Sequence, residues 1–118
     1  MTIDVKRAYD PSAKSDGHRI LIDRIWPRGV TRNDLRIDAW LKDLAPSTEL
    51  RKWFGHDPAK WDEFRKRYAR ELEQRPEALE ELVAQARAGH VTLVFGAKDI
   101  EHNNAVALRE HLERRLRS

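Results

Sequence analysis

Two short apolar runs, each followed at once by charged residues, constrain this chain more than any other feature. The stretch from Ile20 to Gly29 begins as an apolar run and ends in an acid, two arginines, a tryptophan and a Pro-Arg-Gly turn. The second run, Val91–Phe95, leads into Gly96–Asp99 and then into a predicted helix. Apolar runs of this length are typical of buried strands, and open α/β sheets bind ligands beyond the carboxyl ends of their strands. We therefore expect a polar site where these two strands end.

Length and composition limit the possible classes of protein. The 118 residues are enough for one domain with its own core, so we expect a single α/β domain over residues 1–118. The chain has no cysteine, which excludes disulfides, cysteine-ligated metals and a thiol nucleophile. No apolar run approaches the roughly 20 residues of a membrane span, and the N-terminus lacks a signal-peptide pattern. We expect a soluble cytoplasmic protein without a membrane partner, and its oligomeric state is left open.

The charge balance points only weakly to nucleic acid as a partner. Lysine and arginine number 23 against 20 acidic residues, which gives a formal net charge of +3. Domains that follow a phosphate backbone usually gather their basic residues on one face. A small surplus spread over a heavily charged chain is typical of a solvated surface.

The pattern predicts three strands around a helical middle region. The first is Ile3–Lys6, and a loop over Tyr9–Gly17 separates it from a second strand over His18–Ile25, which Pro27 ends. The third is Val91–Phe95. Strands separated by helices indicate a small, mainly parallel sheet of three or four strands layered with helices, with the fourth strand hidden in the pattern.

Capping residues delimit two short helices in the middle of the chain. Asp38 is the expected N-cap of a helix over Ala39–Leu44, which stops before a proline. Ser47 is the expected cap of the next helix, which runs to Phe54 and ends with Gly55 in the left-handed conformation.

Three longer helices follow, each with an apolar stripe. The first begins at Asp57-Pro58, the second runs from Pro76 to Gly89, and the third starts between Asp99 and Asn103. The residues expected to face the core are, in chain order, Trp61, Phe64, Tyr68 and Leu72, then Leu79, Leu82, Val83 and Ala86, then Ala105, Leu108, Leu112 and Leu116.

The first candidate cluster stands at the end of the second strand. Arg24 and Arg28 can bind an anion, and Asp23 can act as a base or an orienting group. Trp26, between the two arginines, is expected at the rim of such a site. The alternative is that Asp23 and the arginines form a structural ion pair that fixes the turn, and the residues favour neither interpretation over the other.

The second candidate cluster follows the third strand. Lys98 adds a positive charge near a helix start, where free backbone amides and the side chains of His102 and Asn103 can bind a phosphate or a carboxylate. Asp99 is a second candidate base. The alternative is simple capping of the helix by Asp99 or Asn103, which explains part of the segment but does not require Lys98.

His56 is the third candidate, in the connection between two predicted helices. Its imidazole can serve as a general acid or base, or it can be a loop residue hydrogen-bonded to the backbone. Asp99 with His102 is a poor metal signature without further ligands, so we expect no metal site. The chain lacks a Gly-rich phosphate loop, a Gly-x-Ser-x-Gly elbow and a dinucleotide fingerprint, so it identifies no cofactor.

Several segments together resemble the YeaO-like bacterial family, domain of unknown function family 488. They are Ile20–Gly29, Trp40–Ser47, Trp53–Pro58, Trp61 with Phe64 and Tyr68, and Ala97–Ala105. The resemblance covers nearly the whole chain, and the Asp-Arg-x-Trp-Pro-Arg-Gly and Ala-Lys-Asp segments are its most specific parts. It implies a compact bacterial α/β domain and no particular reaction, so no catalytic residue is carried over.

We hypothesise a strand-end cleft for an anionic ligand: a nucleotide, a phosphoester or nucleic acid. The anion would be held by Arg24, Arg28 and Lys98. Asp23 and Asp99 would orient or deprotonate the ligand, and His56 would be a third catalytic group. The alternatives are a non-catalytic module that binds nucleic acid or protein, and charges that only lock the fold. Convergence into a concave pocket would favour an enzyme, whereas one continuous basic face would favour the module.

Overall fold

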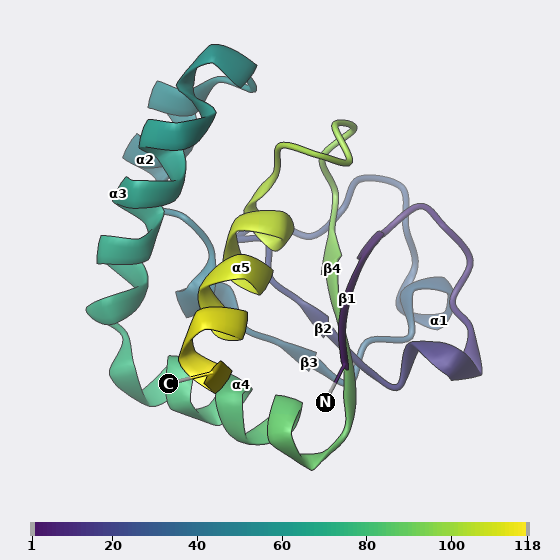
Figure 1. The fold of residues 1–118 in the computed structure, drawn as a ribbon. Coiled ribbons are helices and arrows are strands. Elements are labelled where there is room, and N and C mark those ends of the chain that lie inside the picture. The colour runs from purple at the N-terminus through teal and green to yellow at the C-terminus, as the bar shows by residue number, and fades with distance from the viewer. Residues whose placement is uncertain (1, 118) are drawn as a thin grey trace.

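The computed structural model describes residues 2–117, in which four parallel strands form one sheet (Figure 1). Across the sheet the order is β1 (Thr2–Arg7), β4 (His90–Phe95), β2 (His18–Leu21) and β3 (Ala39–Trp40). All three strand pairs are parallel, which confirms the predicted fold class. The strand that comes last in the chain therefore lies inside the sheet, between the first two.

The central position of β4 follows from its sequence. Five of its six residues, Val91–Phe95, are buried. A parallel strand covered on both faces is a continuous apolar run of this kind. Its pairing with β1 extends from Thr2 opposite His90 to Arg7 opposite Phe95, so the first strand is held along its whole length.

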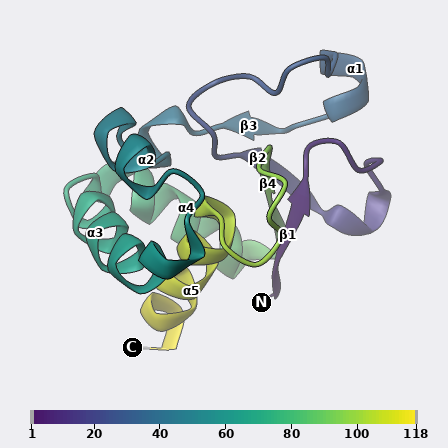
Figure 2. The same cartoon turned by 90° about the horizontal axis from the view of Figure 1, so that it is seen from above.

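The helices cover the two faces of the sheet unequally. The elements are η1 (Lys14–Asp16), α1 (Arg32–Leu35), η2 (Lys42–Leu44), α2 (Thr48–Phe54), η3 (Pro58–Lys60), α3 (Trp61–Glu73), α4 (Pro76–Ala88) and α5 (Asn104–Arg117), where η marks a single 3-10 turn. Figure 2 shows α2, α3, α4 and α5 grouped on one side of the sheet and the short α1 on the other.

The main core lies between the sheet and the four-helix side. Ile20 and Leu93 face it from neighbouring strands, and the stripe predicted for α3 packs against them. Phe64, Tyr68 and Leu72 of that stripe are buried, while Trp61 is half-buried at its edge. The helix starts predicted for this side are confirmed by their caps, since Ser47 Oγ accepts from Leu50 N and Asp57 Oδ1 accepts from Ala59 N.

A smaller core covers the opposite face of the sheet. Leu21 and Val94 point to this side and pack with Leu35 of α1. Trp26 and Trp40 close its border, with their ring centroids 5.4 Å apart in an edge-to-face arrangement. The segment between β2 and β3 is thus folded onto the sheet and does not project from it.

A buried ion pair ties this second face together. Arg19 Nη1 donates to Asp16 Oδ2 over 2.7 Å, and the same guanidinium donates twice to the Leu35 carbonyl. Lys6 Nζ also donates to Asp16, at 3.1 Å. Burial opposes ionisation of Asp16, but hydrogen bonds from Ala13 N, Lys6 and Arg19 outweigh it and hold its pKa below the ordinary value. Three chain segments are therefore joined around one carboxylate.

The helix predicted over Ala39–Leu44 is wrong in its first half. Ala39 and Trp40 instead pair with Ile20 and Leu21 as β3, and only the last three residues form a 3-10 turn. Asp38 does not cap a helix, because its carboxylate accepts from the Arg19 backbone amide at 2.8 Å. An isolated six-residue helix is marginal in water. Pairing with the open edge of β2 instead gives the backbone groups of this segment hydrogen-bond partners. This is the hidden fourth strand.

The second strand is shorter than predicted. It ends at Leu21, with one further bond from Ile22 N to the Val94 carbonyl at 3.2 Å. Beyond it the chain leaves the sheet, and Ile25 is 61% exposed. The last helix begins at Asn104, directly after its predicted starting window, with Asn103 Oδ1 accepting from Val106 N.

Candidate functional site

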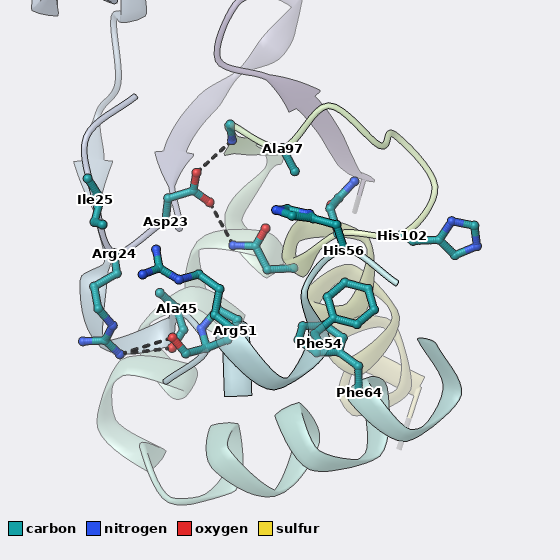
Figure 3. A pocket seen from close by; sticks show the side chains of 14 residues that line it. Asp23, Arg24, Ile25, Ala45, Arg51, Phe54, His56, Phe64, Ala97 and His102 are labelled. Atoms are coloured by element: carbon teal, nitrogen blue, oxygen red, sulfur yellow. Dashed lines mark hydrogen bonds between the residues drawn. The ribbon is translucent and has the colours of Figure 1, made fainter. Parts of the chain in front are cut away.

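A pocket of about 280 Å³ opens beyond the carboxyl ends of β2 and β4 (Figure 3). Its walls come from these strand ends, from α2 and α3, and from the start of α5. The strand ends lie at one edge because β2 and β4 are parallel neighbours. Its apolar lining residues are Ile25, Ala45, Pro46, Phe54, Phe64 and Ala97, and its polar side chains are Asp23, Arg24, Arg51, His56, His102, Asn103 and Asn104.

Asp23 is the most constrained polar residue of the pocket. Its Oδ2 accepts from Gly96 N at 2.8 Å, and its Oδ1 accepts from Asn104 Nδ2 at 2.9 Å. The Asn104 amide also donates to the Ile22 carbonyl at 3.2 Å. The carboxylate is therefore fixed between the ends of two strands and the first turn of α5.

Burial dominates the electrostatics of Asp23. It raises the pKa of the carboxyl above its ordinary value, against the opposing effects of the hydrogen bonds from Asn104 and Gly96 and of the positive charge on Arg51. Burial disfavours the anionic form of this carboxyl, and the carboxyl lies at the wall of a pocket. These two properties make it a candidate functional group.

Two arginines stand beside Asp23. Arg24 Nη2 lies 3.5 Å from each of the Ala45 and Pro46 carbonyl oxygens, at the limit of a hydrogen bond, so most of its donors are open. The side chain of Arg51 extends from α2 toward the Asp23 side of the pocket (Figure 3). Within residues 2–117 its guanidinium makes no hydrogen bond or ion pair, and its positive charge acts electrostatically on Asp23. Arg51 is thus available to a ligand.

His56 lies at the mouth of the pocket in an unusual backbone conformation. Its φ of 57° is left-handed and follows directly on the left-handed Gly55 that ends α2. For an L-residue this conformation costs roughly 1–2 kcal/mol. The ring centroid lies 6.4 Å from that of Phe54, so the strained turn places the imidazole beside the apolar part of the lining.

The predicted residues after β4 form a local capping network. Asp99 Oδ1 accepts from the backbone amides of Glu101 and His102, and its Oδ2 lies 3.0 Å from His102 Nδ1. These bonds lower the pKa of Asp99. Asn103 is buried. Its Nδ2 donates to the Asp99 carbonyl, and its Oδ1 accepts from Val106 N. Asn103 therefore caps α5 as the capping interpretation expects, whereas Asp99 holds the turn that precedes the helix.

His102 lines the pocket but turns away from its centre. Its ring meets the edge of Trp61 at 5.3 Å between centroids, and in Figure 3 it points away from Asp23. Four predicted residues, Asp99, Trp26, Arg28 and Lys98, are outside the lining. Arg28 and Lys98 are exposed, and the Trp26 indole donates to the Val30 carbonyl at 2.7 Å as part of the second core. Of the predicted residues, five line the pocket: Asp23, Arg24, His56, His102 and Asn103.

Sequence reasoning missed Arg51 and Asn104. Arg51 stands beside Lys52 on a short helix, and no spacing rule distinguishes the two. Asn104 follows Asn103 and resembles a second capping residue. One sequence signal points to Arg51: it lies three residues before Phe54, so the two side chains share one side of α2.

The part of the chain that the structure describes contains no group of three His, Cys, Asp or Glu residues able to hold a metal ion. Nor does any helix between residues 2 and 117 have the length and apolarity needed to cross a membrane. The polar side chains that line the pocket are one carboxylate, two guanidinium groups, two imidazoles and two amides.

Comparison with known proteins places the chain in a family. A family model described as the inactive DUF488-N3 subclade matches residues 2–118. The chain belongs to the DUF488 family. This confirms the resemblance drawn from the strand-end motifs. The match extends over the whole described domain, so the pocket belongs to the DUF488 domain itself.

Relatives of this DUF488 protein are similar over almost their full lengths. YeaO of Escherichia coli (strain K12) is 43% identical over 112 residues, which cover 95% of this chain and 97% of YeaO. Mb3100c of Mycobacterium bovis and Rv3073c of Mycobacterium tuberculosis are each 40% identical over 113 residues, which cover 96% of this chain and 95% of theirs. No solved structure matches the chain.

Proposed function

We propose that this DUF488 protein binds a small anionic molecule in the pocket beyond β2 and β4. The observation that carries the proposal is the Arg51 guanidinium, which lies at a partly apolar pocket without a hydrogen-bonding partner among the described residues. A guanidinium presents a planar fork of donors that matches carboxylate, sulfonate and phosphate oxygens. Arg24, with its two long contacts, is the second donor to the same anion.

The size and shape of the pocket favour a small molecule over a nucleic acid strand. Small-molecule sites are concave and mostly apolar with a few polar groups, and the volume of about 280 Å³ is just below their usual range, which favours a small ligand. Phe54 and Phe64 stack with their centroids 4.4 Å apart and supply the apolar wall. Arg28 and Lys98, which would have extended a basic surface, stand outside the lining.

We propose binding without turnover. The family description specifies an inactive subclade, and this supports a pocket that keeps its ligand chemically unchanged. The geometry agrees, because Asp23 is engaged by Gly96 and Asn104 and the Asp99–His102 pair is directed at local capping. On this proposal Asp23, Asp99 and His56 serve binding and architecture.

Calorimetric titration with benzenesulfonate tests the proposal, because this probe combines a flat apolar body with a permanently charged anion. Arg51→Gln should weaken its binding about tenfold or more, since a hydrogen bond to a charged group contributes about 1.5–3 kcal/mol. Lys52→Gln is the matched control: it removes a positive charge from the next residue of α2, which does not line the pocket. Equal effects of the two substitutions would overturn the proposal, as would failure of the unmodified protein to bind both benzenesulfonate and its 3- and 4-(hydroxymethyl) derivatives.

A further inference from the structure

Asp23 has hydrogen-bonding capacity beyond the two bonds that hold it. A carboxylate accepts at about four lone-pair positions, and each oxygen of Asp23 receives one bond from the protein frame, from Gly96 N or Asn104 Nδ2. The remaining lone pairs of the Asp23 carboxylate can accept from a ligand, because Asp23 lines the pocket. We infer that the ligand carries, besides its anionic group, an O–H or N–H donor that binds Asp23. This inference rests on the proposed function and narrows the class of ligand.

The energetics of burial support a donor at this position. A ligand that enters the pocket displaces water from Asp23, and a ligand without a donor leaves a largely buried carboxylate short of partners. Sites built around a hydrogen-bonding group reject analogues that lack the matching group far more strongly than apolar pockets reject an extra methylene. Asp23 therefore selects strongly for ligands that carry a donor, whereas the apolar wall selects only weakly between ligands of different apolar shape.

The charges of the pocket lead to the same class of ligand. Arg24 and Arg51 attract an anion, but Asp23 stands on the same side as Arg51 and interacts with it electrostatically. An anion without a donor is held by the arginines and repelled by the carboxylate. A donor offsets that repulsion by turning the contact with Asp23 into an attractive one.

The apolar wall specifies what lies between the two polar groups. Phe54 and Phe64 form one stacked pair, and Ile25, which is 61% exposed, stands at the open side. A flat apolar body packs against such a wall, and the polar groups at its ends reach the arginines and Asp23. The inferred ligand is thus an aromatic or similarly flat anion with a hydroxyl or amine substituent.

The test compares isosteric probes on the unmodified protein. The 3- and 4-(hydroxymethyl)benzenesulfonates are titrated beside the 3- and 4-ethylbenzenesulfonates, in which a methyl group replaces the hydroxyl. At least one hydroxymethyl compound should bind about tenfold or more tightly than its ethyl counterpart, because an unsatisfied buried group costs a factor of this order. This comparison does not depend on any substitution that could disturb folding.

A variant assigns the preference to Asp23. In Asp23→Asn the preference should shrink markedly, because a neutral amide replaces the charged acceptor, while the ethyl compound should bind as well as before or more tightly, because the repulsive charge is gone. A purely structural role of Asp23 would weaken both compounds equally and would overturn the inference. Asp43→Asn, on an exposed residue outside this pocket, is the control and should leave the preference intact.

The two proposals fail in different ways. If both compounds bind equally well and both depend on Arg51, the donor inference is overturned and the anion site stands. If neither compound binds, or if binding is indifferent to Arg51→Gln, the proposed function fails and the inference fails with it.

Discussion

The carboxylate of Asp23 accepts the backbone amide of Gly96 at 2.8 Å and so links the end of β2 to the end of β4. The approach is close enough that a Cβ on residue 96 would lie 3.0 Å from the same carboxylate oxygen. The absence of a side chain at residue 96 therefore helps to set the position of the pocket's acid.

The substitution Gly96→Ala should displace Asp23 and weaken binding of benzenesulfonate or its hydroxymethyl derivatives. We expect a loss of stability of about 1–3 kcal/mol, because overpacking forces neighbouring groups to shift. Gly89→Ala is the control, since a Cβ there meets nothing within 4 Å and the backbone is extended. Urea denaturation and calorimetry of both variants measure the effect. If Gly96→Ala matches Gly89→Ala in stability and in binding, Asp23 tolerates the methyl group and the prediction is wrong.

Phe64→Ala should destabilise the protein by roughly 3–5 kcal/mol, the usual cost of removing a buried aromatic ring. The ring is 2% exposed and stacks on Phe54 and on Trp61, with centroids 4.4 and 5.7 Å away. Phe64→Leu should cost much less, because most of the volume is retained. Chemical denaturation that gives the same small loss for both variants would contradict this packing.

The ion pair on the second face predicts a specific dependence of stability on pH. Because the pKa of Asp16 is lowered in the folded state, its ionisation stabilises the protein above about pH 3.8, where an ordinary aspartate titrates, and this contribution is lost as the pH falls through the lowered value. Asp16→Asn should cost about 3 kcal/mol near pH 7, since it leaves Arg19 buried without its partner. The stability difference between the two proteins should narrow below about pH 3.8. A difference that stays constant down to the acid-unfolding range would refute the pairing.

His56→Gly should separate stability from binding. Glycine adopts a φ of 57° without strain, so the variant should be as stable as the original or more stable by up to about 1 kcal/mol. Binding of benzenesulfonate should weaken, because the imidazole beside Phe54 is removed. Thermal unfolding read beside calorimetry tests both outcomes. A clear loss of stability would mean that the ring supports the fold.

Local chemistry explains which elements were predictable from the sequence. The caps at Ser47 and Asp57 and the left-handed Gly55 depend on residues within one turn of the chain, and each is found in the structure. The strand β3 was missed because Ala39–Trp40 has no strand pattern of its own. It is extended only because β2 offers it an open edge.

The same distinction applies to the site. Asp23 and Arg24 were found because they follow a strand directly, and strand ends of a parallel sheet converge. Lys98 met the same criterion but stands outside the pocket, since the segment after β4 turns into the capping network around Asp99. Arg51 was missed because its spacing from Phe54 places it on one side of α2 but does not show that this side meets the strand ends, which depends on packing between segments far apart in the sequence.

The two bonds that fix Asp23 have a consequence for how the pocket comes into being. They connect residues 73 and 81 positions apart, so the orientation of the carboxylate depends on β4 lying beside β2 and on α5 being in place. A fragment that ends before Asn104 lacks one of the two bonds. Ligand binding in the pocket therefore requires the folded chain. A ligand that binds only the folded chain raises the free energy of unfolding in proportion to the logarithm of its concentration, once that concentration is well above Kd.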